Sequence, residues 1–406
     1  MRIAITGARG FLGQQIVPVL LERGASLLLI GRQGGPDQMS NGLPVVGYEE
    51  IARAGANFHA LIHLAVLNND KSAPAEEFIR VNADLAVQTC IEARAANIGR
   101  FYFISSTHAL DETNKSAYAE SKRIAAERLR AIDGIVVEIL FLPAILGDKT
   151  GGKLKALNRL PSPLRAIALP LAQALKPTVD INRFVDRIIS GSLSASPPFR
   201  LEIIANPQAA NPAFRFAKRL LDVVLSLGVI VALWWLMIIV WVVIRVQSAG
   251  PGIFAQERVG QDQRVFTCYK FRTMYASTPD IGTHEVSLSA VTPFGHFLRG
   301  TKIDELPQVI NILKNEMSFV GPRPCLPSQS ALIKQRRLRG IFDVKPGITG
   351  LAQVRRVDMS DPERITEWDY RYIGLQSLVL DFKILLATAM GKGSGDRIDA
   401  GPARSD

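Results

Sequence analysis

Cysteine is scarce in this chain of 406 residues, which has only three. Cys90, Cys268 and Cys325 lie far apart and without metal-ligand spacing, so they imply neither a disulfide framework nor a zinc site, and they indicate a reducing compartment. A basic stripe interleaved with aromatic residues is also missing. The net charge of +11 therefore suits anionic headgroups and phosphorylated substrates, and no nucleic acid is expected as a partner. Because no signal peptide precedes the first strand pattern, we expect the first domain to stay on the cytoplasmic side.

Charge and proline are both absent from the 22 residues that follow Asp222 in the stretch Leu220–Ile244. A bilayer core about 30 Å thick needs roughly 20 apolar residues of helix, and the stretch lacks the polar stripe of a soluble amphipathic helix. It is predicted to enter the membrane; the alternative is a helix buried in a large soluble core. Basic residues on both sides favour a re-entrant helix that leaves the cytoplasmic leaflet on the side where it entered. These flanking residues are Arg215, Lys218, Arg219, Arg245 and Arg258.

The N-terminal region has the strand, glycine turn and helix pattern of a dinucleotide-binding fold. After a short apolar strand at 2–6, Gly7 permits a tight turn, Gly10 lets the backbone approach a pyrophosphate, and Gly13 allows close packing of the helix. Arg32 follows the second strand, where an NAD-binding fold usually has an acid. It favours the 2′-phosphate of NADP(H) over NAD(H), and the alternative is a solvated strand end.

Further strand patterns at 60–65 and 101–107 alternate with helical patterns, which predicts a parallel, doubly wound α/β sheet. Tyr118 and Lys122 follow, four residues apart on one helical face. A nearby ammonium and the cofactor would lower the pKa of the phenol, so that Tyr118 serves as acid or base in hydride chemistry at a sugar carbon. Ser106 or Thr107 would share its hydrogen bond. The alternative is a chance pair on a helix surface.

With these motifs in this order, the first 205 or so residues resemble the extended short-chain dehydrogenase/reductase family of nucleotide-sugar epimerases, dehydratases and 4-keto reductases. The resemblance implies that Tyr118 and Lys122 are catalytic with Ser106 as their partner, and that Gly7, Gly10 and Gly13 bind the cofactor. The chain departs from the family at 141–147, where Phe-Leu-Pro-Ala-Ile-Leu-Gly replaces the usual Arg-Pro-x-x-Val-Tyr-Gly, and its substrate-binding part is short. The sugar pocket is therefore either reduced or completed by another subunit of a homo-oligomer.

The second half of the chain centres on adjacent carboxylates, Asp304 and Glu305. Asp304 is predicted at the start of a helix, with Pro307 in the first turn. One interpretation is an N-cap followed by a first-turn acid that complements the helix dipole. The other is an ionised carboxylate able to carry a phosphate in the same field, surrounded by cations suited to phosphoryl transfer. The candidate substrate-binding residues are Arg258, Lys270, Arg272, Arg299 and Arg323, with Lys302 beside them.

Residues from Lys218 to about Leu386 resemble the bacterial sugar transferases, the monotopic polyprenyl-phosphate phosphoglycosyl transferases. The motifs are Lys-Arg-Leu-Leu-Asp at 218–222, Gln-Glu-Arg-Val-Gly at 256–260, Lys-Phe-Arg-Thr-Met at 270–274, Asp-Glu-Leu-Pro-Gln at 304–308, Phe-Val-Gly-Pro-Arg-Pro at 319–324 and Pro-Gly-Ile-Thr-Gly-Leu-Ala-Gln at 346–353. The resemblance implies that Asp304 attacks a UDP-sugar and releases UMP, that polyprenyl phosphate then takes the phosphosugar, and that Mg²⁺ bridges the diphosphate and the Asp304–Glu305 pair. The chain departs from the family at Trp234-Trp235, where a Ser-Pro pair commonly bends the helix, and at 289–292, which lacks the usual arginine.

The sequence thus predicts a bifunctional enzyme of the bacterial inner membrane, with both domains facing the cytoplasm. We expect a Rossmann-like domain at 1–207, a linker at 208–212, a membrane-associated helix at 213–250, a small α/β phosphoglycosyl transferase domain at 251–390 and a flexible tail at 391–406. The first domain would reduce or epimerise a nucleotide sugar, and the second would transfer its phosphosugar to polyprenyl (undecaprenyl) phosphate. The alternative is a first domain that only binds a sugar nucleotide or a partner.

Overall fold

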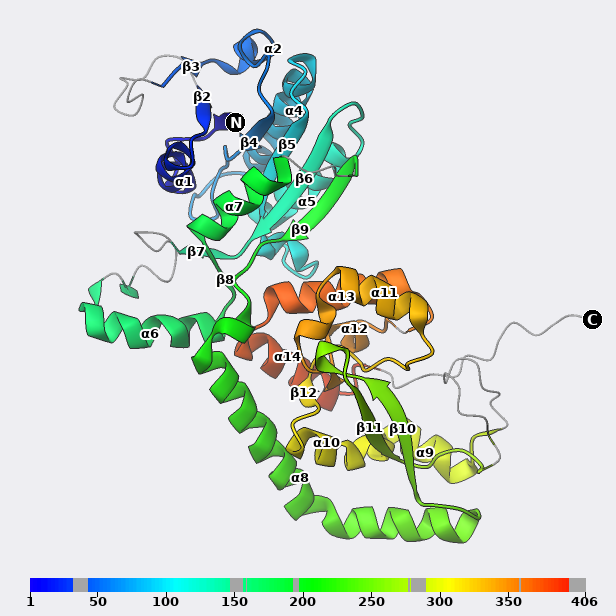
Figure 1. Ribbon diagram of the computed structural model, residues 1–406. Coiled ribbons are helices and arrows are strands. Elements are labelled where there is room, and N and C mark those ends of the chain that lie inside the picture. The colour runs from blue at the N-terminus through cyan, green and yellow to red at the C-terminus, as the bar shows by residue number, and fades with distance from the viewer. Residues whose placement is uncertain are drawn as a thin grey trace, which may run out of the picture. The chain divides into compact units, whose positions relative to one another are not determined.

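The computed structural model describes residues 1–31, 43–146, 156–157, 159–192, 197–276, 278, 290–357 and 359–393. The chain forms two compact units (Figure 1). Unit 1 contains residues 1–169 and 177–206, and unit 2 contains residues 170–176 and 207–406.

Unit 1 is built on a parallel sheet of seven strands in the order β3-β2-β1-β4-β5-β6-β9. The predicted doubly wound α/β fold is confirmed. Ile3, Ala4 and Ile5 in β1 are completely buried, as expected for a strand covered on both faces. The strands are β1 (Arg2–Thr6), β2 (Ser26–Ile30), β3 (Val45–Val46), β4 (Ala60–His63), β5 (Arg100–Ser106), β6 (Val136–Leu142) and β9 (Phe199–Ile203).

The helices of unit 1 lie in two groups on the sheet. Ile16 and Leu20 of α1 pack in one core with Phe184 and Ile188 of α7, while α4 and α5 lie on the other side (Figure 1). The order of strands reverses between β1 and β4, so a crevice is expected at their carboxyl ends. The helices are α1 (Phe11–Glu22), α2 (Ile51–Ala54), α3 (Ala75–Ile79), α4 (Leu85–Ala95), α5 (Ala117–Arg130) and α7 (Ile181–Ser192), and a small sheet pairs β7 (Ala144–Leu146) with β8 (Thr178–Asp180). Helix α6 (Ser162–Leu175) begins in unit 1, and its residues from 170 onward belong to unit 2.

Unit 2 begins with α8, a helix of 36 residues from Pro212 to Gln247 that is longer than the predicted apolar stretch. Asn211 caps it by accepting hydrogen bonds from the backbone N–H groups of Ala213 and Phe214. The remaining elements are β10 (Ile253–Val259), β11 (Val265–Phe271), α9 (Pro293–Thr301), η9 (Ile303–Gln308), α10 (Val309–Leu313), β12 (Ser318–Val320), α11 (Ser330–Leu338), β13 (Gly347–Thr349), α12 (Leu351–Val354), α13 (Pro362–Leu375) and α14 (Leu378–Ala389).

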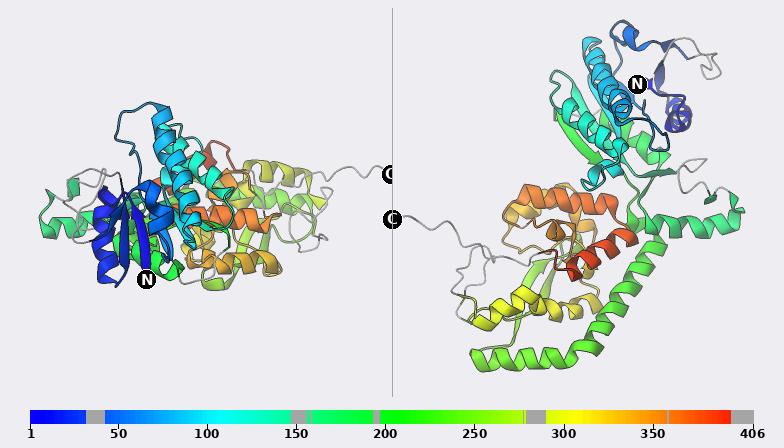
Figure 2. Two further views of the ribbon diagram at one scale, coloured as in Figure 1. Left: turned by 90° about the horizontal axis from the view of Figure 1, so that it is seen from above. Right: turned by 180° about the vertical axis from the view of Figure 1, so that it is seen from behind.

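Both ends of α8 pack against other elements of unit 2, and the helix bends between them (Figures 1 and 2). Near its start, the Asp222 carboxylate accepts hydrogen bonds from the Ser318 hydroxyl and the Phe319 N–H, each at 3.0 Å. Near its end, Val240 and Ile244 lie in a core cluster with Phe271 and Leu298. The most apolar window of the helix has a mean hydropathy of 2.8 and is only 11% buried, so most of its apolar surface lacks cover within the described residues.

Candidate functional site

The glycine turn after β1 is too tightly packed for larger residues. Gly7 has φ +69°, and a Cβ added to it would lie 2.7 Å from the backbone of Leu64 and Ala65. A Cβ on Gly13 would lie 2.4 Å from the Ala8 carbonyl oxygen, so the close approach of α1 to the turn requires glycine at this position. Gly10 forms the N-cap of α1 without a side-chain hydrogen bond. The turn therefore presents backbone and a helix N-terminus at the carboxyl end of β1, as an anionic cofactor requires.

Three polar residues that the sequence analysis did not single out hold the neighbouring strand ends. The Thr6 hydroxyl accepts hydrogen bonds from the Leu64 and Ala65 N–H groups and pairs with His63 Nδ1 at 3.1 Å. Burial and then Lys122 lower the pKa of His63 to about 3, so its ring is neutral. Asn82 accepts from the Leu67 N–H at 2.7 Å and donates to the Ser121 hydroxyl at 3.0 Å. Asn82 lies in a π-helical turn at 80–84, a bulge often found at functional sites.

The structure brings Ser106, Tyr118 and Lys122 to the carboxyl end of β5. Ser106 is the last residue of β5, and its hydroxyl bonds the Tyr118 phenol and lies 2.9 Å from His108 Nδ1. Tyr118 and Lys122 lie on α5, which the Ser116 hydroxyl caps. The Lys122 ammonium donates to the Ile104 carbonyl at 2.9 Å.

The pKa of Tyr118 in the protein alone is set mainly by burial, while its predicted lowering also involves the cofactor. Burial raises it, and the hydrogen bond with Ser106 opposes that rise only in part. Lys122 was expected to lower the pKa of Tyr118, but burial lowers the pKa of Lys122 itself to about 7. Desolvation is thus the largest cause of the pKa shift of each group. Arg32, the predicted reader of the 2′-phosphate, lies outside the described residues.

The carboxylates of unit 2 lie in a short 3₁₀ helix rather than at the predicted helix start. Lys302, with φ +60°, turns the chain from α9 into η9, and Asp304 is the second residue of η9. The N-cap of η9 is Lys302, and among the described residues no backbone N–H donates to the Asp304 side chain. Its exposed fraction is 9% and that of Glu305 is 8%. The capping interpretation of Asp304 therefore has no support in the geometry.

Three of the predicted cations surround this pair. Glu305 Oε1 lies 3.2 Å from the Lys270 ammonium and 3.4 Å from Arg323 Nη1. The Asp304 carboxylate accepts no hydrogen bond from the described residues. Burial and then the charge of Glu305 raise its pKa to about 6, while Lys270, Arg299 and Arg323 act in the opposite direction. At neutral pH Asp304 is therefore a buried, ionised carboxylate that has no direct partner among the described residues.

The other two predicted substrate-binding cations serve the backbone. Arg272 donates to the carbonyls of Ser248 and Ala249, at 2.8 and 2.9 Å, and so holds the chain that follows α8. Arg258 donates to the Pro324 carbonyl at 3.1 Å and thereby supports the turn that carries Arg323. Arg258 lies in β10, whereas Lys270 lies in β11 and Arg272 follows the end of that strand.

Asp304 and Glu305 are the two carboxylates of this site that could bind a metal ion. Among the described residues, no group of three or more His, Cys, Asp or Glu side chains could hold a metal ion. Mg²⁺ commonly binds through one or two carboxylates together with substrate phosphates. Burial and then the charge of Glu305 raise the pKa of Asp304, and a cation bound between the two carboxylates would oppose both effects. The pair therefore fits Mg²⁺ without a dedicated protein cage.

Comparison with known sequences matches each half of the chain. Residues 213–392 match the model of the bacterial sugar transferase family, and residues 3–146 match that of the NAD dependent epimerase/dehydratase family. An uncharacterized sugar transferase EpsL of Bacillus subtilis is 36% identical over 171 residues, which cover 42% of this chain and 84% of the relative. A UDP-glucose:undecaprenyl-phosphate glucose-1-phosphate transferase of Xanthomonas campestris is 38% identical over 189 residues, which cover 44% of this chain. The chain spans only 39% of the latter protein's length.

Solved structures resemble unit 1. The Bordetella bronchiseptica enzyme WbmG in complex with NAD has a TM-score of 0.39 and 20% identity, and the match covers 50% of this chain and 72% of that one. The UDP-N-acetylglucosamine 4-epimerase of Bacillus cereus has a TM-score of 0.39 and 17% identity, with 51% and 78% covered.

Proposed function

Because this chain belongs to the bacterial sugar transferase family, we propose that unit 2 transfers a phosphosugar from a UDP-sugar to polyprenyl phosphate. The observation that carries this proposal is the contrast between the two carboxylates. Glu305 is paired with Lys270 and Arg323, whereas Asp304 is ionised at neutral pH and accepts no hydrogen bond from the described residues. An unpaired carboxylate among cations is suited to attack a phosphorus atom.

The proposed reaction has two steps. An Asp304 oxygen attacks the phosphorus that bears the sugar, the bond from that phosphorus to the bridging oxygen breaks, and UMP leaves with the electron pair. A polyprenyl phosphate oxygen then attacks the same phosphorus, and Asp304 leaves as a carboxylate. Lys270, Arg299 and Arg323 neutralise the charge on the phosphoryl oxygens. Lys270 and Arg323 also keep Glu305 in place beside the nucleophile.

Asp304 and Glu305 would also hold Mg²⁺, which neutralises part of the diphosphate charge when bound. This assignment rests on the two buried carboxylates described above and on the raised pKa of Asp304. Two cations already pair with Glu305, so the two carboxylates would bind a single divalent ion. Oxygen atoms of the substrate would supply its remaining ligands.

We further propose that unit 1 binds a nicotinamide cofactor and reduces or epimerises a nucleotide sugar, as its family match suggests. The glycine turn accepts the pyrophosphate, and Arg32 would favour NADP(H). Tyr118 would move a proton at the sugar, with Ser106 as its hydrogen-bond partner and Lys122 beneath the site.

A second interpretation of unit 1, a binding module without turnover, is favoured by the short substrate-binding part that follows residue 147 in the sequence. A second copy of the chain could complete the short sugar pocket. An Arg32→Asp variant that binds NADPH and NADH with the wild-type preference would refute the cofactor assignment. Nucleotide-sugar turnover that Tyr118→Phe abolishes would exclude the binding module.

For α8 we propose a re-entrant position in the cytoplasmic leaflet of the bacterial inner membrane, with both units in the cytoplasm. A straight helix of this length would extend about 54 Å and place its ends on opposite sides of a bilayer. The contacts of Asp222 at one end and of Ile244 at the other with the same compact unit support a return to the starting side. The Trp235 indole N–H donates to the Ala232 carbonyl at 2.9 Å. Side-chain bonds of this kind accompany helix bends that lack proline.

The decisive experiment measures UMP formed from UDP-sugars by the purified protein in detergent, before any polyprenyl phosphate is added. Wild type should release up to one UMP per active site and keep a covalent phosphosugar, and Asp304→Asn should do neither. Asp361→Asn is a matched control, because Asp361 is a true N-cap that accepts from the Arg364 N–H at 3.0 Å; this variant should behave as wild type. Covalent phosphosugar on the Asp304→Asn protein would refute the assignment.

A further inference from the structure

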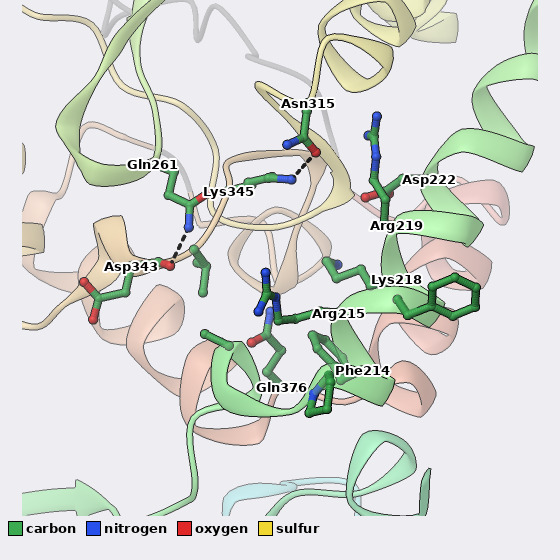
Figure 3. Close-up of a pocket in the computed structure, with 14 residues that line it drawn as sticks. Phe214, Arg215, Lys218, Arg219, Asp222, Gln261, Asn315, Asp343, Lys345 and Gln376 are labelled. Carbon is green, nitrogen blue, oxygen red and sulfur yellow. Dashed lines mark hydrogen bonds between the residues drawn. The ribbon is translucent and has the colours of Figure 1, made fainter. Parts of the chain in front are cut away.

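A basic cavity of about 700 Å³ lies in unit 2 beside the first turns of α8 (Figure 3). It is lined by the start of α8, by Asn315 after α10 and by the segment 343–345 before β13. None of the described residues around Asp304 contributes to its lining. The cavity is therefore separate from the proposed site of phosphosugar transfer and has no role in that reaction as described above.

Four cations line the cavity, and two of them are held by the protein. Lys218 donates to Asp381 Oδ2 at 2.6 Å and to the Val320 carbonyl at 3.0 Å. Arg219 donates to the carbonyls that end α10, at 2.7 and 3.0 Å. These bonds fix the wall of the cavity and leave its positive charge only partly balanced.

The other two cations are available to a ligand. The Arg215 side chain is exposed, donates to no described residue and lies in the middle of the group in Figure 3. Lys345 lies on another wall of the cavity, and its ammonium donates to the Asn315 side chain. Burial and then repulsion from Arg219 lower the pKa of Lys345, with Lys218 and Arg215 adding to the repulsion and Asp222 opposing it. An anion placed between these cations would relieve that repulsion.

The acids of the lining do not neutralise this charge. Asp222 already accepts hydrogen bonds from the Ser318 hydroxyl and the Phe319 N–H. The Asp343 carboxylate points away from the cations in Figure 3. The cavity thus has the character of a phosphate site rather than of an internal ion-pair network.

Apolar surface leads away from the cavity along α8. Phe216 lines it and is 71% exposed, and Leu220 and Val224 on the following turns are 52% and 56% exposed. A soluble phosphate would leave this surface uncovered, whereas a ligand with a hydrocarbon chain would cover it.

We propose that this cavity binds the phosphate group of an anionic membrane lipid, with Arg215 and Lys345 as its charge partners and the hydrocarbon chains along α8. The proposal rests on the membrane position of α8 and not on the transfer chemistry of Asp304. The bound lipid would hold the start of α8 at the level of the headgroups.

The test is a titration of the full chain, in neutral detergent, with short-chain phosphatidylglycerol, with short-chain phosphatidylcholine and with inorganic phosphate, followed by the shift in unfolding temperature. Phosphatidylglycerol should stabilise the wild type, and the other two should not at the same concentration. Arg215→Gln and Lys345→Gln should each weaken binding about fivefold, and the double variant roughly 25-fold, the size expected for charges at an anionic lipid surface. Arg215→Lys should keep most of the affinity.

A matched control removes one lysine and one arginine elsewhere. Lys334→Gln with Arg364→Gln, on α11 and α13, changes the net charge equally, and both side chains are exposed and outside the cavity. This control should bind the lipid as wild type does. Equal stabilisation by inorganic phosphate, equal loss in the control, or wild-type binding by the cavity double variant would each overturn the proposal. Because the readout is lipid binding, absence of UMP release in the wild type would count against the transferase proposal alone.

Discussion

Replacing Asp304 with asparagine should stabilise the protein at neutral pH while it abolishes phosphosugar transfer. The reason is that the fold holds this carboxylate where its charge is unfavourable. Burial and Glu305 raise the pKa of Asp304 from its ordinary value of 3.8 to about 6. An acid whose pKa is raised on folding binds protons more tightly in the folded state, so its ionisation opposes folding.

The size of the effect follows from this difference. A shift of about two pKa units corresponds to about 3 kcal/mol, at about 1.4 kcal/mol per unit. The penalty is absent below the unfolded pKa of 3.8, develops as the pH rises toward 6 and is complete above it. By the same linkage relation it amounts to about 3 kcal/mol at pH 7.5 and about 0.5 kcal/mol at pH 4. For a unit of this size, 3 kcal/mol corresponds to a rise in unfolding temperature of roughly 6–12 °C.

The assay compares thermal unfolding of wild type and Asp304→Asn in the same detergent between pH 4 and pH 8. The difference in stability should grow with pH up to about 7 and then remain constant. The Asp361→Asn cap variant should not be more stable than wild type at pH 7.5, because asparagine retains the cap. If Asp304→Asn were no more stable than wild type at pH 7.5, or if its advantage were the same at pH 4, then the carboxylate would not be strained by the fold. The physical basis for its reactivity would then be wrong.

UMP release in the first half-reaction should rise with pH through about 6, because Asp304 must be ionised to attack. Glu305→Gln should slow release and move this rise to lower pH, and a profile unchanged from wild type would contradict the proposed coupling. Single cysteines at Ala213 and at Ser248, in a background without the three native cysteines, should both be labelled only from the cytoplasmic side. Labelling of either one from outside would establish a spanning helix. Trp235→Phe should lower stability by about 1 kcal/mol through loss of the bond to a backbone carbonyl, with UMP release unchanged; unfolding at the wild-type temperature would show that this bond does not support the bend.

The local features of this protein could be predicted from the sequence alone, because each depends on neighbouring residues. The glycines at 7, 10 and 13 specify a turn that no larger side chain fits, and the spacing is visible in a single chain. The alternation of strands and helices specified the parallel sheet, and the unbroken apolar stretch specified one long helix in place of several short ones. The adjacency of Asp304 and Glu305 predicted a candidate site but left the capping interpretation open.

Tertiary structure decided which charges act at that site, because ion pairs join residues far apart in the chain. Lys270 is 35 residues from Glu305, and Arg323 is 18 residues away on the other side. Arg272 looked equivalent to Lys270 in the sequence, yet it holds the carbonyls after α8. The contribution of Asn82 to unit 1 likewise depends on the approach of α5.

The same distinction applies to the pKa values and to α8. Local sequence indicated that a lysine near Tyr118 would lower its pKa, but the depth of burial, which only packing determines, reversed the direction. Hydrophobicity and length predicted a membrane helix, and the basic residues at its two flanks favoured a return to the starting side. The structure adds that both ends of α8 contact the same compact unit, through Asp222 and Ile244. These contacts join residues far apart in the chain, so composition could not predict them.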